Sequence, residues 1–443
     1  MKVALIRGRW HSVWEPLALG YLYSYTKDLP NVDYIYMGDG AFDSDEEIIK
    51  HCAEADIVGF SGTTSQMPWS LRIASAIRLR SPDVRIYIGG YGPSVDPGSF
   101  VEKVHGVVVG EGETPWKEIL ESGGMESGVI YRPPVSNLDS IPFPNREFIR
   151  VERCIDVAKR EEGRRVTGIL GNRGCLRRCV FCADGLPKSI YGVKLRERSP
   201  KNCVDEMIQV SDEWNIDFLK WADAEFNTRP GRTKEMCAEM VARELKINWG
   251  ANFLANPWED GDGALLYRAG CREAWIGLES GSLAIHRTIG KGVTPNLIAH
   301  ALKDARDGGL VRRCYVLLGM PDETLETIAE TEALIDSSEP DFVSFSILAS
   351  YPGTNFYRPE MASWDWEHID EYGGDANQFH NLGITKMNRE QLLNERIRLM
   401  EKYAGKLPAI VKKKRDLGWI GYAPNKVIST DEIQITDYSD RCG

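Results

Sequence analysis

The sequence lacks any apolar run of the roughly 18–20 residues that a membrane-spanning helix needs. Its first residues, 1–7, form a short apolar stretch that Arg7 and Arg9 soon interrupt. The long apolar region of a secretory signal peptide is missing, so we interpret this stretch as a first β-strand. These features predict a cytoplasmic protein without a membrane span.

Cysteine is sparse, with ten residues in a chain of 443. This density excludes the disulfide-stapled scaffold of a small secreted domain. Seven of the cysteines are scattered, but Cys175, Cys179 and Cys182 fall within eight residues. In a reducing compartment, such a cluster indicates metal binding rather than a disulfide bridge.

An excess of basic residues is also missing, because the formal net charge is −11. Proteins that bind nucleic acid normally present a basic face. The basic run Lys412–Arg415 follows the apolar residues 409–411 and is typical of the solvated side of a helix. The charge therefore argues against a nucleic-acid substrate.

Residues 1–125 alternate between short apolar runs and stretches with helical spacing. This alternation predicts a doubly wound parallel sheet of the α/β class, in which ligands bind beyond the carboxyl ends of the strands. Glycines fall at several of these ends, where backbone can approach a large flat ligand. The expected strands are 2–6, 32–37, 56–61, 84–88 and 107–109, and the last of these is expected to end the sheet.

Residues 126–165 show no clear periodicity and contain Pro133, Pro134, Pro142 and Pro144, so we expect a linker. From residue 166 to about 358 the alternation returns, with units about thirty residues long. This pattern predicts a partial (β/α)6 barrel resembling a TIM barrel, with its chemistry at the carboxyl ends of the strands. The expected strands are 166–170, 218–221, 247–252, 274–278, 314–318 and 342–347. Residues 359–443 form a small C-terminal region whose role the sequence does not indicate.

The cysteine cluster follows the first strand of this second domain and has the spacing C-x3-C-x2-C. Three thiolates can hold three irons of a [4Fe–4S] cluster and leave the fourth iron open for another ligand. A structural zinc site normally uses four protein ligands. The nearest further cysteines, Cys154 and Cys203, do not have a zinc-like spacing. Zinc, or three free thiols in the core, is the alternative interpretation.

This motif resembles the signature of the radical S-adenosylmethionine (SAM) superfamily. The resemblance implies that SAM chelates the open iron and that reduction cleaves it to methionine and a 5′-deoxyadenosyl radical. Phe181 occupies the position at which the family usually has an aromatic residue beside the adenine. By the same resemblance, SAM contacts are expected from Asp223 or Glu225 after the second strand and from Glu279 and Ser280 after the fourth.

Two later segments, Gly319–Thr324 and Tyr351–Thr354, also resemble landmarks of this family. We expect them to be architectural, the first as a turn with a helix cap and the second as a tight loop. Asp223 and Glu279 have an alternative interpretation as well. Each could be a helix cap or an ion-pair partner instead of a SAM contact.

An α/β domain placed before such a barrel resembles the cobalamin-binding class of the superfamily. The resemblance implies a cobalamin site at the carboxyl ends of the strands, and we expect contacts from Ser61, Gly62, Thr63, Thr64, Gln66, Gly89, Gly90, Tyr91, Gly110, Glu111 and Gly112. None of the seven histidines has Asp two positions before it, so the D-x-H-x-x-G motif of some cobalamin proteins is missing. The cobalt would therefore lack that histidine ligand, and Gln66 or Met67 is expected near its lower face. Alternatively, the domain keeps the fold and binds nothing.

The leading hypothesis is a cobalamin-dependent radical SAM methyltransferase. It would methylate an unactivated carbon of a small molecule or peptide, using methylcobalamin and the 5′-deoxyadenosyl radical, because cofactors supply the difficult chemistry. The second hypothesis is a radical SAM cyclase or rearrangement enzyme that transfers no methyl group. A third is an iron–sulfur redox or sensor protein, although such proteins usually use four cysteines. The expected partners are the substrate and an electron donor such as flavodoxin or ferredoxin.

Overall fold

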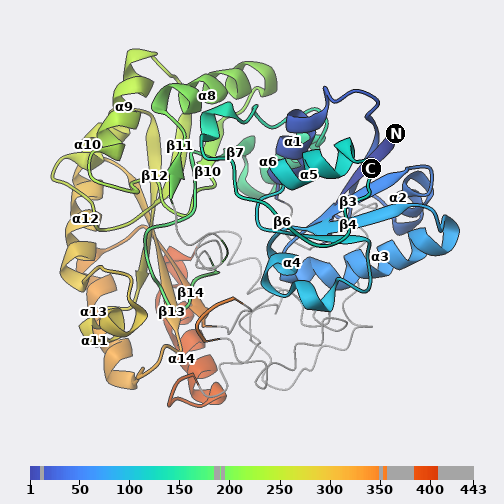
Figure 1. The fold of residues 1–443 in the computed structure, drawn as a ribbon. Helices are drawn as coiled ribbons and strands as arrows, with labels where there is room; N and C mark the ends of the chain where they lie inside the picture. The colour runs from blue at the N-terminus through green and yellow to red at the C-terminus, as the bar shows by residue number, and fades with distance from the viewer. Residues whose placement is uncertain (10–13, 184–189, 191–194, 349–352, 357–383, 408–443) are drawn as a thin grey trace. The chain divides into compact units, whose positions relative to one another are not determined.

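The computed structural model describes residues 1–9, 14–183, 190, 195–348, 353–356 and 384–407 (Figure 1). The described chain forms two compact units. The first extends from Met1 to Cys154, and the second begins at Ile155. Each unit contains a six-stranded parallel sheet. No helix in the described ranges is long and apolar enough to cross a membrane.

The sheet of the first unit has the strand order β2-β1-β3-β4-β5-β6. Helices cover both faces, with α3 on one face and α1 and α5 on the other (Figure 1). The predicted doubly wound sheet is therefore confirmed. Its strands are β1 (Lys2–Arg7), β2 (Asp33–Asp39), β3 (Ile57–Ser61), β4 (Arg85–Gly89), β5 (Gly106–Val109) and β6 (Gly128–Tyr131), and its helices are α1 (Leu17–Thr26), α2 (Asp45–Cys52), α3 (Met67–Arg80), α4 (Tyr91–Val95) and α5 (Glu113–Glu121).

The segment 126–165, which we expected to be a linker, contains regular structure. Residues 128–131 form β6, which pairs in parallel with β5, so residues 107–109 do not end the sheet. Val151–Glu162 form helix α6. β6 escaped the sequence analysis because it is a four-residue edge strand in which Val129 and Tyr131 are exposed, so it has no apolar run. Helix α6 buries Val151 and Ile155 at helical spacing, but its charged end at 159–162 hid this short pattern.

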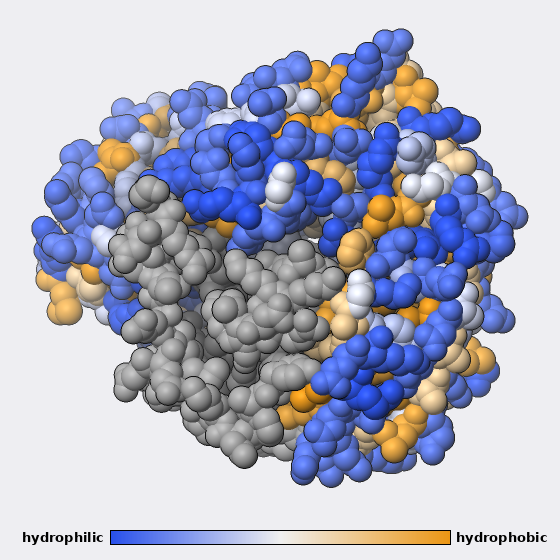
Figure 2. All heavy atoms as spheres, turned by 180° about the vertical axis from the view of Figure 1, so that it is seen from behind, coloured by the Kyte–Doolittle hydropathy of each residue, from blue (hydrophilic) through white to orange (hydrophobic). Residues whose placement is uncertain are grey.

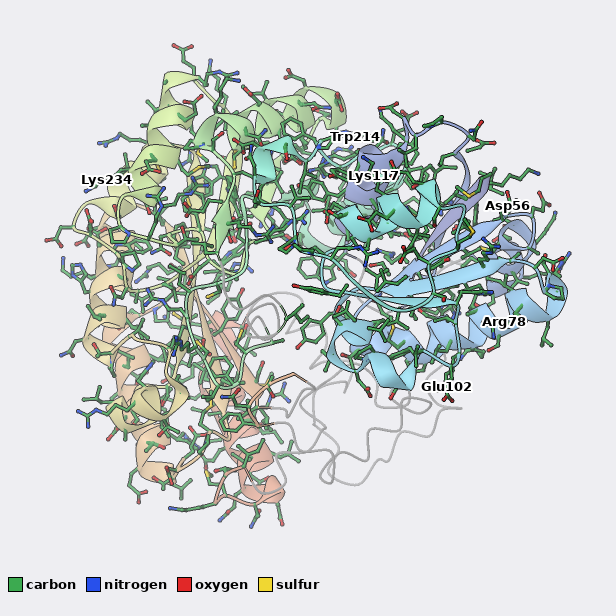
Figure 3. The ribbon with its side chains drawn as sticks, in the orientation of Figure 1. Asp56, Arg78, Glu102, Lys117, Trp214 and Lys234 are labelled. Carbon is green, nitrogen blue, oxygen red and sulfur yellow. The ribbon has the colours of Figure 1, made fainter. Side chains whose placement is uncertain are left out.

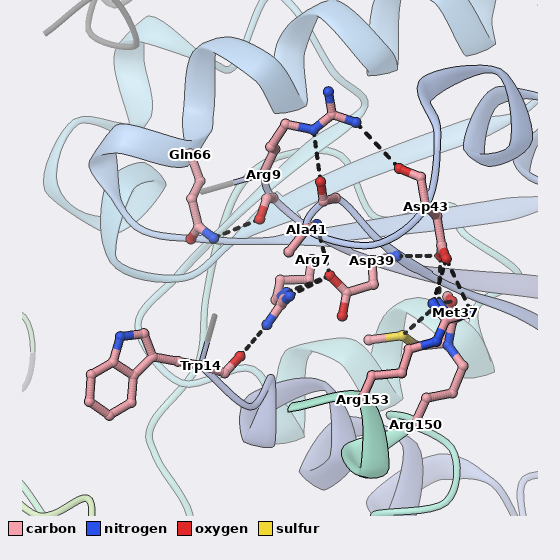
Figure 4. A network of polar contacts seen from close by, with 12 residues as sticks. Arg7, Arg9, Trp14, Met37, Asp39, Ala41, Asp43, Gln66, Arg150 and Arg153 are labelled. Atoms are coloured by element: carbon pink, nitrogen blue, oxygen red, sulfur yellow. Dashed lines mark hydrogen bonds and ion pairs between the residues drawn. The ribbon is translucent and has the colours of Figure 1, made fainter. Parts of the chain in front are cut away.

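A polar network fastens the start of α6 to the first sheet (Figure 4). The Asp43 carboxylate, just beyond β2, is hydrogen-bonded by Arg150 at 2.5 Å and by Arg153 at 2.7 Å. Arg150 also donates to the carbonyl oxygen of Met37 at 2.5 Å. The two guanidinium groups help to hold the pKa of Asp43 below its usual value, although burial opposes them. Asp43 therefore ties the segment after β6 to the end of β2.

We expect Asp43→Asn to lower the free energy of unfolding of the first unit by about 2–3 kcal/mol at neutral pH. Breaking a fully buried ion pair costs more, but Arg150 and Arg153 are partly exposed. Because folding lowers the pKa of Asp43, its contribution is present above the unfolded pKa and is lost as pH falls through the folded pKa. Urea unfolding of both proteins should thus show a difference at pH 7 that shrinks below about pH 4. A constant difference down to pH 2.5 would contradict this account.

The sheet of the second unit has the order β14-β13-β12-β11-β10-β7. Among the described residues β14 does not pair with β7, so the sheet stays open and the predicted partial barrel is confirmed. Its strands are β7 (Val166–Ile169), β10 (Phe218–Trp221), β11 (Asn248–Phe253), β12 (Cys271–Glu279), β13 (Val311–Leu318) and β14 (Phe342–Ile347), and its helices are α8 (Pro200–Trp214), α9 (Arg232–Ala242), α10 (Asp262–Arg268), α11 (Leu283–Ile289), α12 (Pro295–Asp307), α13 (Leu325–Ser338) and α14 (Arg389–Lys402).

One face of this sheet packs against the helices and forms the largest core cluster, which includes Leu219, Ile276 and Phe345. Helix α14 belongs to the same core, because Leu392 and Leu399 on it are buried there. Part of the predicted C-terminal region of unknown role is thus an element of the second unit. Residues 359–383 and 408–443 of this region lie outside the described residues.

The described surface is mostly hydrophilic on the face in Figure 2, and its apolar side chains occur in small groups. Charged side chains such as Arg78 and Lys234 project outward from α3 and α9 (Figure 3). This distribution is ordinary for a protein in contact with water.

Candidate functional site

The three clustered cysteines lie on a loop at the carboxyl edge of the second sheet. The loop follows β7 and β8 (Asn172–Arg173), and β8 pairs antiparallel with β9 (Arg196–Glu197), which comes after the cysteines in the chain. All three thiols are partly exposed. The Arg177 backbone N–H donates to the Cys175 sulfur at 3.3 Å, a contact that stabilises a thiolate. The loop thus presents its sulfurs as a metal-binding loop requires.

The three sulfurs do not converge on one point. Among the described residues, no group of three Cys, His, Asp or Glu side chains is placed to hold a single metal ion. In an iron–sulfur cluster each thiolate binds a different iron, so convergence on one point is not needed. The donor set and its arrangement are therefore compatible with a cluster.

Two backbone hydrogen bonds hold the cysteine loop in place. The Val180 N–H donates to the Ile289 carbonyl at 3.1 Å, and the Asn355 N–H donates to the Val180 carbonyl at 3.1 Å. Phe181 packs against a small apolar cluster that includes Ile289 and Met320. The aromatic residue predicted beside the adenine therefore also anchors the loop to α11 and to the end of β13.

Asp223 lies just after β10, where the sequence predicted an acidic residue. Its side chain is buried and accepts hydrogen bonds from the backbone N–H groups of Gly171 at 2.8 Å and Asn172 at 3.1 Å, and from the Asn172 amide at 2.8 Å. Burial raises the pKa of Asp223 to about 7, although these hydrogen bonds oppose it. Asp223 therefore clamps the base of the cysteine loop to β10, and its contact with SAM stays a prediction.

If Asp223 is such a clamp, Asp223→Ala should reduce the iron retained by the chain severalfold. The substitution removes the acceptor for three N–H groups, two of them on the loop backbone, and leaving buried donors unpaired is costly. Asp223→Asn should retain more iron, because its oxygen can still accept the two backbone hydrogen bonds. The measurement is iron per chain after anaerobic reconstitution and desalting. Equal iron in wild type and Asp223→Ala would rule out the clamp.

Glu225 and Glu279, two other predicted SAM contacts, both lie close to the cysteines. The Cys175 thiol contacts the Glu225 carboxylate at 3.3 Å. Glu279 pairs with Lys291 at 2.7 Å, and the Lys291 ammonium also donates to the Gly277 carbonyl at 2.7 Å. Burial raises the pKa of the Cys179 thiol to about 11. The Glu279 and Glu225 carboxylates also raise this pKa, whereas the Lys291 ammonium lowers it. Two acids and one buried ammonium therefore surround the cysteines.

Lys291 was missed by the sequence analysis. It stands between Gly290 (φ +67°) and Gly292 (φ +74°), and this left-handed turn runs against the cysteine loop. The signal that could have found it is the Gly-Lys-Gly sequence that follows α11. Glu279 itself has φ +57°, an unusual conformation for a non-glycine residue, where the pairing of β12 with β13 shifts.

Ser280 is also buried, but its hydroxyl is engaged inside the protein. It lies 3.2 Å from the Thr331 hydroxyl on α13 and accepts from the Ser282 backbone N–H at 3.1 Å. The structure places this residue beside Glu279 and gives its side chain an internal partner. In the neighbouring landmark, Thr324 caps α13 by accepting from the Thr327 N–H, as the sequence predicted.

The carboxyl edge of the first sheet brings together the other set of predicted residues. Residues 61–66 follow β3, 89–91 follow β4 and 110–112 follow β5, and these three strands are neighbours. The Gly62 N–H donates to the Gly89 carbonyl at 3.2 Å, and the Gly92 N–H donates to the Gly62 carbonyl at 3.3 Å. The loops after β3 and β4 are thus joined through backbone alone.

Gly90 is the tightest point of this edge. It has φ +97°, and a Cβ atom there would lie 2.6 Å from the Gly62 carbonyl oxygen. Ser94, which the sequence analysis missed, donates to the Gly90 carbonyl at 2.6 Å and accepts from the Gly110 N–H at 2.8 Å. The resulting edge is smooth backbone that a large flat ligand can approach.

Gln66 and Met67, which we expected near the lower face of a cobalt, have other tasks. The Gln66 amide accepts from the Thr63 N–H at 2.7 Å and donates to the Gly8 carbonyl at 2.7 Å, so it joins the loops after β1 and β3 (Figure 4). Met67 is fully buried in the core of the first unit. Thr64, by contrast, has a buried hydroxyl for which the described residues provide no hydrogen-bond partner. The backbone at Gly62, Gly90 and Gly110 forms what we call the glycine edge. The Thr64 hydroxyl and this edge fit a polar ligand at this position.

Comparisons with known protein families match both units. Residues 4–120 match the B12 binding domain, and residues 169–335 match the radical SAM superfamily. The chain is 28% identical over 370 residues to an uncharacterized methyltransferase of Pyrococcus horikoshii, with 79% of each chain covered. It is 24% identical over 394 residues to an anaerobic magnesium-protoporphyrin IX monomethyl ester cyclase of Rubrivivax gelatinosus, covering 81% of this chain and 70% of that one. It is 25% identical over 391 residues to bacteriochlorophyllide d C-12(1)-methyltransferase of Chlorobaculum tepidum, covering 83% and 79%.

Solved structures share the fold. The radical SAM methyltransferase TsrM of Kitasatospora setae, with cobalamin and a [4Fe–4S] cluster bound, matches with a TM-score of 0.66 at 20% identity, covering 80% of this chain and 73% of that one. The cobalamin-dependent SAM radical enzyme OxsB matches with a TM-score of 0.63 at 18% identity, covering 91% and 61%. The two matched families are those that bind cobalamin and that bind SAM with a [4Fe–4S] cluster. The chain is therefore a radical SAM enzyme, and it belongs to the class of that superfamily that carries an N-terminal B12 binding domain.

Proposed function

We propose that this enzyme transfers a methyl group from SAM, by way of cobalamin, to an unactivated carbon of a small molecule. The observation that carries the proposal is that one chain has both the glycine edge of the first sheet and the three-cysteine loop of the second. When bound, the cluster and SAM supply a 5′-deoxyadenosyl radical and cobalamin supplies the methyl group. The protein provides binding, orientation and electrostatics.

The side chains around the cysteine loop have the charges that SAM requires. Cys175, Cys179 and Cys182 would hold three irons. The Lys291 ammonium complements a carboxylate and the Glu225 carboxylate complements an ammonium group, and both lie close to the cysteines. Because Lys291 is held by Glu279 and the Gly277 carbonyl, it is already oriented before SAM arrives. We therefore assign Lys291 and Glu225 to the amino-acid end of SAM.

The proposed cobalamin contacts are the backbone groups of the glycine edge. Gly62, Gly90 and Gly110 expose backbone at three neighbouring strand ends, and Ser94 fixes the last two relative to each other. The buried hydroxyl of Thr64 is the side-chain group that the ligand would satisfy. The Gln66 amide is engaged with the Thr63 N–H and the Gly8 carbonyl, so it would hold the loop beside the ligand.

The curated relatives and solved neighbours support a small-molecule substrate. They include enzymes named for bacteriochlorophyllide d and for a cytidylyl hydroxyethylphosphonate, and TsrM was solved with tryptophan. Methyl transfer is tested by incubating the reduced holoenzyme with SAM that carries a CD3 group and with each of these compounds. The proposal expects S-adenosylhomocysteine, 5′-deoxyadenosine and a product heavier by one CD3 group in place of hydrogen.

The second candidate is a radical cyclase, which the similarity to the anaerobic magnesium-protoporphyrin cyclases favours. A cyclase would consume the porphyrin ester without incorporating CD3. Formation of 5′-deoxyadenosine without S-adenosylhomocysteine, together with an unlabelled product, would therefore identify the enzyme as a cyclase and not as a methyltransferase.

A further inference from the structure

Radical formation requires an electron from outside the chain, because SAM is cleaved only after a one-electron reduction. The surface through which this electron enters must lie close to the cysteine loop. Leu176, adjacent to Cys175, exposes 51% of its surface. Arg178, in the same loop, is exposed as well. The loop therefore reaches the surface between two of its cysteines.

A second segment adds to this surface. The Val180–Ile289 hydrogen bond brings the end of α11 beside the loop, and the Arg178 carbonyl lies 3.3 Å from where a Cβ of Gly290 would be. Gly290 and Arg287, in the last turn of α11, are both exposed. We call Leu176, Arg177, Arg178, Arg287 and Gly290 the Leu176 patch.

The Leu176 patch is positively charged, whereas the whole chain has a negative net charge. The net charge is −11, and several exposed arginines elsewhere in the second unit pair with carboxylates, as Arg243 does with Asp205 and Arg398 with Glu332. Within the described residues no carboxylate pairs with Arg177, Arg178 or Arg287; Arg177 instead donates to the Asn256 carbonyl. An exposed apolar side chain among unneutralised guanidinium groups is suited to an acidic protein partner.

We propose that the Leu176 patch is the docking surface for a small acidic electron-transfer protein. This inference rests on the proposed function, since a chain that cleaves no SAM needs no such donor. In the encounter, the reduced cofactor of the donor loses one electron and the cluster on Cys175, Cys179 and Cys182 gains it, and no atom or proton is transferred. Electron-transfer encounters use small interfaces, which a patch of this extent can provide.

The test compares Arg287→Glu with wild-type holoenzyme, using reduced flavodoxin as the donor. We expect the Kd for flavodoxin at low salt to rise at least tenfold, and wild-type binding to weaken as salt is added. SAM cleavage driven by flavodoxin should fall by a similar factor. SAM cleavage driven by dithionite, a small reductant that needs no docking surface, should stay at the wild-type level, as should the iron content.

Lys246→Glu is the matched control. Lys246 is exposed, and it precedes β11 at the amino edge of the same sheet, opposite the cysteine loop. The change in charge is the same, so a general electrostatic effect would weaken both variants equally and would overturn the proposal. Arg178→Glu provides a second test at the patch, with iron content measured because it lies between two cysteines.

The two hypotheses fail in different ways. If wild-type holoenzyme does not cleave SAM even with dithionite, the proposed function is wrong, and the Kd comparison still tests the patch. If dithionite supports cleavage but Arg287→Glu and Arg178→Glu bind and use flavodoxin like wild type, the function stands and the docking surface lies elsewhere.

Discussion

Replacing Cys179 by alanine should remove the iron–sulfur cluster and with it all SAM cleavage. Cys179 is the middle one of the three thiols on the loop that we propose to hold the cluster. With two thiolates the cluster loses one of its anchored irons. We expect iron to fall from about four per chain to near zero, with loss of the brown absorbance and of 5′-deoxyadenosine formation. Cys175→Ala and Cys182→Ala should behave in the same way.

The control is Cys237→Ala. Cys237 on α9 is fully buried in the core of the second unit and is not part of the cysteine loop. Its loss should cost some stability and leave the iron unchanged. If Cys237→Ala loses its iron, or if Cys179→Ala keeps it, the ligand assignment is wrong.

Gly90→Ala should abolish cobalamin binding while leaving the cluster intact. Gly90 combines a left-handed φ with the closest backbone approach at the edge of the first sheet, so a methyl group would collide with the Gly62 carbonyl. With ψ at −166° as well, Gly90 lies in a region that is essentially restricted to glycine, and this conformation alone costs an alanine about 1–3 kcal/mol. Moving the Gly62 loop away would also disturb the contacts that Ser94 makes with Gly90 and Gly110. We expect cobalamin affinity to fall at least tenfold, measured by the absorbance of bound hydroxocobalamin after desalting.

Gly98→Ala is the matched control in the same unit. A Cβ at Gly98 would meet only Asp96, at an ordinary contact distance of 3.6 Å, and the residue has no left-handed φ. It should bind cobalamin like wild type. Normal cobalamin binding by Gly90→Ala would show that the glycine edge does not contact the ligand, and the cobalamin contacts would have to be sought elsewhere.

The sequence predicted most of the fold because both sheets are parallel and buried on at least one face. Such strands are short apolar runs that alternate with helices, and β10 and β14 occupy the predicted residues 218–221 and 342–347. The edge strand β6 escaped because two of its four residues face solvent. Helix α6 escaped because its charged end at 159–162 hides the helical spacing of its buried residues Val151 and Ile155.

The candidate site was predictable where one local motif carries it. Cys175, Cys179 and Cys182 lie within eight residues, so their spacing alone indicates the cluster. Lys291 is recognised by its contacts with Glu279 and Gly277, and Ser94 by its contacts with Gly90 and Gly110, which are visible only in the structure. The role of Asp223 was only partly predictable. The sequence places an acidic residue after β10, but only the structure shows that the Asp223 carboxylate holds the cysteine loop.

The most direct test of this account is cobalt and iron per chain. The protein would be reconstituted anaerobically with iron, sulfide and hydroxocobalamin, desalted, and analysed for both metals. The account predicts about one cobalt and about four irons per chain, both cofactors being held by the same molecule. About four irons without cobalt would contradict it, leaving the first sheet without a ligand and favouring a radical cyclisation or rearrangement without methyl transfer.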